Sequence, residues 1–103
     1  MIKIRHTGLV TINLKKSLIF WKNILKFKII KQSEESGDLI NRIMQYNDCL
    51  VHTIKLSDNA GMILELLYFK NSPKIKKNII KPYSNGFTHI SVTVKNIMKI
   101  YKT

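Results

Sequence analysis

The chain has 103 residues and a formal net charge of +12 at pH 7, with 45% hydrophobic and 23% charged residues. This length suits one domain with a modest core, and the composition is that of a globular chain, which excludes a disordered or collagen-like protein. No apolar run approaches the roughly 18 residues of a transmembrane helix, and the N-terminal residues lack the pattern of a secretory signal. The single cysteine, Cys49, excludes an intrachain disulfide and a multi-cysteine zinc site. Together these features predict a cytoplasmic protein that does not associate with membranes.

The positive charge taken alone would indicate a nucleic-acid binder. However, 16 of the 18 basic residues are lysines and only two are arginines, and Ile and Asn are also abundant, as codons rich in A and T would produce. Arginine is the residue that reads bases and phosphates with two parallel hydrogen bonds. The densest lysine run, within residues 74–81, falls in a predicted loop. We interpret it as a solvated loop, so nucleic acid is not an expected partner, and a basic nucleic-acid module remains a minor alternative.

The first half of the chain predicts a strand, a helix and a second strand. Residues 2–10 are rich in β-forming side chains and carry one polar outlier, His6. Asn13 is a suitable N-cap for a helix over about 14–26. A stripe at helical spacing, with adjacent aromatic residues, predicts the buried side of that helix: Leu14, Leu18, Phe20, Trp21, Leu25 and Phe27. Residues 27–32 predict a short strand, and residues 33–38 a polar turn.

The second half predicts further strands and a final helix. Residues 39–48 fit either a short helix or an irregular strand. Alternation over 50–56 predicts a strand, residues 57–61 a hairpin loop, and residues 62–69 an apolar strand that carries one acid, Glu65. Residues 70–86 read as a linker, residues 87–95 as a strand that carries His89, and residues 96–102 as the start of a helix.

Two parts of the chain repeat the same layout. When His6 is placed over His89, Asn13 coincides with Asn96, so each copy is a histidine-bearing strand that leads into an Asn-capped helix. The chain ends early in the second copy, and no residue corresponds there to Glu65. We expect a fragment, the product of a frameshifted gene, or a half that depends on a partner.

Three residues are candidates for chemistry: His6, Glu65 and His89, each within an otherwise apolar strand. An ionised carboxylate in such a strand is costly unless it is paired or binds a metal. Two imidazoles and one carboxylate suit zinc, iron, nickel, cobalt or manganese. The alternative is that the three are unrelated residues on a solvated face, with Glu65 paired to a lysine.

Three other polar or reactive residues are interpreted as structural. His52 shares the parity of Ile54 and Leu56 on its strand, which favours a packed or edge histidine. Cys49 has no neighbouring cation to lower the pKa of its thiol and reads as a small apolar residue. Tyr83 lies in the linker, where a solvent-facing ring is expected.

The order and spacing of these motifs resemble the vicinal oxygen chelate superfamily, which includes glyoxalase I, extradiol dioxygenases and the bleomycin resistance proteins. The resemblance spans residues 2 to about 101, and Lys26 replaces a glycine that family members have at the end of the first helix. Four stretches carry it: His6 to Val10, Asn13 to Phe27, Met62 to Leu66, and Gly86 to Val94.

The resemblance implies an α+β fold with a glyoxalase-like βαβββ module whose mixed sheet curls around a site. The module would occupy residues 1–69, followed by a linker over 70–86. Residues 87–103 would then be an incomplete second module, made of one strand and the start of a helix.

The resemblance also implies a metal site and an activity. His6 and Glu65 would be the ligands of the first module and His89 the first ligand of the second, with Glu65 also the catalytic carboxylate. The divalent metal would chelate two adjacent oxygens of a small substrate and stabilise an enolate, as in a lyase or isomerase. The fourth ligand has no counterpart here. The alternatives are a metal-free small-molecule binding or resistance protein of the same fold, or an inactive truncated member.

A single module would leave an open sheet, which predicts a homodimer. In one arrangement two first modules pair about a two-fold axis and bring together His6 and Glu65 from each chain. In the other, strand 87–95 inserts beside its own first strand and the site holds three ligands.

Overall fold

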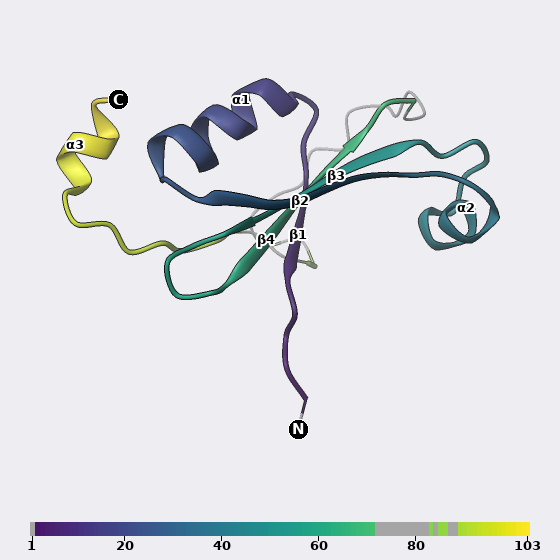
Figure 1. The fold of residues 1–103 in the computed structure, drawn as a ribbon, viewed down its shortest axis with the longest axis horizontal. Coiled ribbons are helices and arrows are strands. Elements are labelled where there is room, and N and C mark those ends of the chain that lie inside the picture. Colours follow the sequence, from purple (N-terminus) through teal and green to yellow (C-terminus); the bar gives the residue numbers. More distant parts are fainter. Residues whose placement is uncertain (1, 72–82, 84, 87–88) are drawn as a thin grey trace. The chain divides into compact units, whose positions relative to one another are not determined.

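The computed structural model describes residues 2–71, 83, 85–86 and 89–103, and the chain divides into two compact units, Met1–Ser72 and Pro73–Thr103. The described part of the second unit contains one short helix, α3 (Ile97–Tyr101). No helix within the described residues is long and apolar enough to cross a membrane. The elements of the first unit are β1 (Thr7–Val10), α1 (Leu14–Leu18), the π-helical segment η1 (Ile19–Ile24), β2 (Lys28–Glu35), α2 (Asp38–Met44), β3 (Val51–Ser57) and β4 (Ile63–Phe69) (Figure 1).

The four strands form one mixed sheet in the order β1-β4-β3-β2. β1 runs parallel to β4, and the β2–β3 and β3–β4 pairs are antiparallel. Helices and a mainly antiparallel sheet in this order confirm the predicted α+β class. The strand β4 therefore lies between β1 and β3, which places His6, the residue just before β1, near the acidic residue of β4.

The first helix begins where the sequence predicts. The Asn13 side chain accepts a hydrogen bond from the Lys16 amide at 3.0 Å, which caps the first turn of α1. α1 continues directly into the wider η1 turns, which end at Leu25. Lys26 then adopts a left-handed conformation, with φ of 63°. Glycine takes this conformation at least cost, which gives a physical reason for the glycine that the superfamily resemblance implies at this turn.

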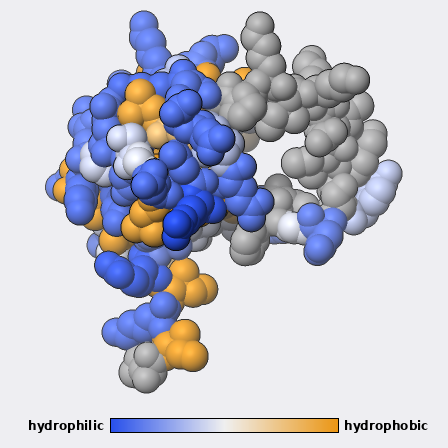
Figure 2. Space-filling view, turned by 90° about the vertical axis from the view of Figure 1, so that its right-hand side faces the viewer, coloured by the Kyte–Doolittle hydropathy of each residue, from blue (hydrophilic) through white to orange (hydrophobic). Residues whose placement is uncertain are grey.

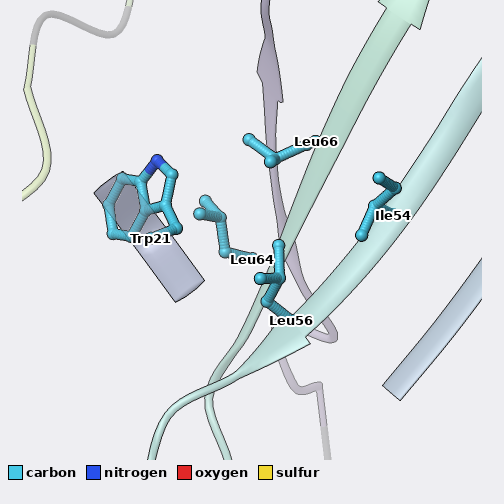
Figure 3. Close-up of a cluster of buried hydrophobic side chains, with 5 residues drawn as sticks. All are labelled: Trp21, Ile54, Leu56, Leu64 and Leu66. Atoms are coloured by element: carbon cyan, nitrogen blue, oxygen red, sulfur yellow. The ribbon is translucent and has the colours of Figure 1, made fainter. Parts of the chain in front are cut away.

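The predicted hydrophobic stripe packs on one face of the sheet. Trp21 is only 8% exposed and contacts a cluster of strand residues, while Leu14, Leu18 and Leu25 pack around it. The strand residues of this cluster are Ile54, Leu56, Leu64 and Leu66 (Figure 3). Phe20 departs from the prediction, because it is 43% exposed, although its ring packs edge-to-face with Trp21.

The structure corrects two local predictions and decides one that was open. The polar turn predicted at 33–38 is wrong, because residues 33–35 continue β2 and pair with β3. Of the strand predicted at 2–10, only Thr7–Val10 pairs with a neighbour. The ambiguous stretch 39–48 contains α2, whose Ile40 is buried with Cys49 and Val51. In the two corrected cases the decisive factor is a partner strand from a distant part of the chain.

The second unit repeats the cap of the first. Asn96 accepts a hydrogen bond from the Lys99 amide at 3.1 Å, with φ and ψ of −138° and 95° against −137° and 89° at Asn13. The predicted helix is therefore present. The predicted strand 87–95 is not, because the described residues 89–95 adopt no strand; residues 87–88 lie outside the described part. An extended segment becomes a strand only through a hydrogen-bonded neighbour, which its own sequence does not specify.

Candidate functional site

The two faces of the sheet differ in chemistry. Side chains alternate between faces along a strand, so the residues that flank the Trp21 cluster in sequence point to the opposite side. We call this second side the site face. It carries Ser33, Thr53, Lys55, Glu65 and Leu67. α2 packs over one end of it, where Val51 is fully buried and Leu67 and Phe69 are partly buried.

His6 and Glu65 meet on this face. The His6 Nε2 atom lies 3.6 Å from the Glu65 Oε1 atom, and the two side chains are 36% and 15% exposed. The separation is too long for a hydrogen bond and is that of an ion pair or of two ligands that share one ion. Glu65 therefore has a histidine as its partner, and no lysine within the described residues forms an ion pair with it.

The register of β1 explains the contact. Gly8 lies directly beside Glu65 in the parallel β1–β4 pair, and His6 precedes Gly8 by two residues, so it lies on the same face. Because Gly8 has no side chain, His6 can reach diagonally to the carboxylate. A Cβ atom at position 8 would lie 3.2 Å from Leu67 Cδ1, so this is also a tight position for any larger residue.

Two lysines continue this row across the sheet. Lys55 is directly opposite Glu65 on β3, and Lys31 is directly opposite Lys55 on β2. Lys55 is half-buried, and Lys31 is exposed. In the next row, the hydroxyls of Ser33 and the buried Thr53 are hydrogen-bonded at 2.8 Å. Both side chains therefore lie on the site face, as the strand pairing indicates.

The hydroxyl group of Tyr46 is buried at the α2 end of the site face, where the ring packs against the cluster of Ile40, Cys49 and Val51. The Tyr46 hydroxyl is buried and has no hydrogen-bond partner among the described residues. Burial, with a contribution from the neighbouring Cys49 thiol, raises the pKa of Tyr46 to about 12. The desolvated hydroxyl oxygen is a cost to stability.

The other candidate residues are two histidines, a cysteine and a tyrosine. His89 belongs to the second unit and is exposed. His52 lies on the opposite sheet face of the interior strand β3, half-buried and with its Nε2 atom 3.3 Å from Gln32 Oε1, which fits a packed histidine and not an edge one. Cys49 is buried and Tyr83 is 86% exposed, as predicted. Over the described ranges, no three His, Cys, Asp or Glu side chains come close enough to hold one metal ion.

Sequence reasoning overlooked Lys31 and Lys55 as site residues. The alternation along residues 50–56 places Lys55 on the face opposite Ile54 and Leu56, and this was the available signal. Its position beside Glu65 and Lys31 depends on strand register, which the sequence pattern does not reveal.

Comparison with known proteins decides the family. The family model described as Glyoxalase/Bleomycin resistance protein/Dioxygenase superfamily matches residues 3–103. The chain belongs to this superfamily. The fold is similar to the crystal structure of a glyoxalase family protein from Bacillus cereus, with a TM-score of 0.83 and 15% sequence identity, over 99% of this chain and 69% of that one. No curated protein matches the chain. The superfamily membership predicted from the motifs around His6, Trp21, Glu65 and His89 is thus confirmed.

Proposed function

We propose that this superfamily member is a metal-dependent lyase or isomerase of the glyoxalase type, which acts in the cytoplasm on a small substrate with two adjacent oxygens. The observation that carries the proposal is the contact at 3.6 Å between His6 Nε2, just before β1, and Glu65 Oε1 on the neighbouring parallel strand β4. The pair is partly exposed, so a small molecule can reach it from solvent.

The donor atoms fit a divalent metal ion. Zinc bonds to nitrogen and oxygen are about 2.0–2.2 Å, so two ligands of one ion lie roughly 3–3.5 Å apart. The His6–Glu65 separation of 3.6 Å requires little movement to reach that range. We propose His89 as a third ligand, because the sequence repeat places it over His6 and the same Asn-capped helix follows each histidine.

Glu65 and His6 have different roles in the proposed reaction. A bound divalent ion would supply Lewis acidity to the two adjacent substrate oxygens. Glu65 has a second carboxylate oxygen that can accept a proton from the carbon next to those oxygens. His6 orients the Glu65 carboxylate from one side, and the β1–β4 pair keeps both groups on the site face.

Metal titration of single-residue variants tests the assignment. His6→Gln and Glu65→Gln should each weaken Co²⁺ or Zn²⁺ binding by about 10-fold or more, because each removes one donor. His52→Gln is the matched control, since it removes the third histidine of the chain from the opposite sheet face and should leave metal binding unchanged. Equal metal affinity in all three variants and the wild type would show that the pair is not a ligand set.

The second candidate is a metal-free binding protein of the same fold. It is favoured by the absence, within the described ranges, of any three metal-ligating side chains in one cluster. The two candidates differ in the same titration, because a metal-free binder shows no stoichiometric uptake of Co²⁺ or Zn²⁺.

We further propose that the chain functions as a homodimer. β1 is an edge strand of the described sheet, and the residues before it extend beyond the sheet as a segment of alternating hydrophobic and hydrophilic side chains (Figures 1 and 2). Ile2 and Ile4 in this segment are 101% and 82% exposed. A second copy that covers this edge could supply another His6 and Glu65. Sedimentation at micromolar concentration should give a dimer, whereas a cooperative 12.0 kDa monomer would contradict it.

A further inference from the structure

One row of residues crosses all four strands on the site face. From β2 to β1 it consists of Lys31, Lys55, Glu65 and Gly8, each directly opposite the next in the strand pairing. The row therefore joins two adjacent cations to the carboxylate of the His6–Glu65 pair. Gly8 leaves its β1 end without a side chain.

The two lysines are an unfavourable pair in the protein alone. Like charges directly opposite each other on a sheet repel, because their Cβ atoms are only about 4.5–5.5 Å apart. Within the described residues neither Lys31 nor Lys55 forms an ion pair. The only acid in the row, Glu65, has its Oε1 atom directed to His6, at 3.6 Å. The half-buried Lys55 thus lacks a direct anionic partner on a face rich in other polar groups.

We propose that Lys31 and Lys55 form an anion subsite that binds the carboxylate or phosphate-type group of the substrate. An oxyanion placed between the two ammonium groups accepts hydrogen bonds from both and removes their repulsion. The reacting part of the same molecule then lies beside Glu65, one strand away. This assignment of substrate class rests on the proposed function, while the anion subsite itself depends only on the two lysines.

Anion binding by charge-neutral variants tests the subsite. The probes are oxalate and inorganic phosphate, titrated in EDTA and followed by amide shifts of β2 and β3. Lys31→Met and Lys55→Met keep most of the side-chain length, and each should weaken binding roughly five- to tenfold. Lys15→Met is the matched control: it removes the same charge from exposed α1, on the other side of the sheet, and should change binding less than twofold.

Stability provides an independent readout. Because each substitution relieves like-charge repulsion, Lys31→Met or Lys55→Met should raise the Tm of the free protein by about 1–5 °C. Weaker anion binding with an equal or higher Tm cannot arise from a damaged fold. The proposal is overturned if neither probe binds the wild type, or if Lys15→Met weakens binding as much as the site variants do.

Glu65→Gln separates this subsite from the metal site. The substitution should weaken metal binding by about 10-fold or more, yet it should leave oxalate and phosphate binding equal or tighter, because it removes a negative charge next to Lys55. A protein that binds the probes through Lys31 and Lys55 but takes up no metal contradicts the proposed enzyme and supports the anion subsite. A protein that takes up metal but does not bind the probes through Lys31 and Lys55 contradicts only the anion subsite.

Discussion

Replacement of Trp21 by alanine is the most direct test of how the first unit is stabilised. The indole is 8% exposed and packs against Ile54, Leu56, Leu64 and Leu66 (Figure 3). It also makes edge contacts with two phenylalanine rings, at centroid distances of 5.1 and 5.3 Å. Removing a buried Trp typically costs about 3–5 kcal/mol, from lost burial and the cavity that remains. A chain of this size has a free energy of unfolding of about 5–15 kcal/mol, so Trp21→Ala should remain folded but much less stable.

Urea unfolding followed by far-UV circular dichroism measures this loss, because the chain has only one tryptophan and the variant has no indole fluorescence. Ile12→Ala is the control. Ile12 is 95% exposed, and its loss should change stability by less than about 0.5 kcal/mol. If Trp21→Ala costs less than about 1 kcal/mol, Trp21 does not anchor the helix on the sheet and the packing argument is wrong.

Two further substitutions test the left-handed backbone at Lys26 and the buried hydroxyl of Tyr46. Lys26→Gly should raise the free energy of unfolding by about 0.5–1 kcal/mol in the same urea assay, because Lys26 has a φ of 63° and glycine removes the strain of that conformation; a loss of stability would contradict this. Tyr46→Phe should stabilise the protein by about 1 kcal/mol at neutral pH, because it removes a buried hydroxyl that has no partner among the described residues. The pKa of Tyr46 is about 12 in the folded protein, above its ordinary value of 10.0, so the folded state loses stability relative to the unfolded chain as pH rises from 10 toward 12. Tyr46→Phe should reduce this alkaline loss, whereas Tyr83→Phe, at an 86% exposed position, should not.

Local periodicity in the sequence predicts most of the fold. The stripe through Leu14, Leu18, Trp21 and Leu25 identified the buried side of the first helix, because residues three and four apart lie on one helical face. Asn13 and Asn96 were recognised as caps because the capping hydrogen bond forms within three residues. The errors occur where a partner is distant: Ser33 belongs to β2 because it pairs with Thr53, not because of its own propensity.

The sequence by itself singled out His6 and Glu65 as polar residues in apolar strands, and their chemistry named them as candidate ligands. Only the tertiary structure decided that β1 lies parallel to β4, with Gly8 beside Glu65, and so brought the imidazole to 3.6 Å from the carboxylate. It alone also placed Lys31 opposite Lys55. Alternation along a strand states which face a residue occupies, but its neighbours across the sheet are set by hydrogen-bond register between segments up to tens of residues apart, and no pattern within one segment contains that register.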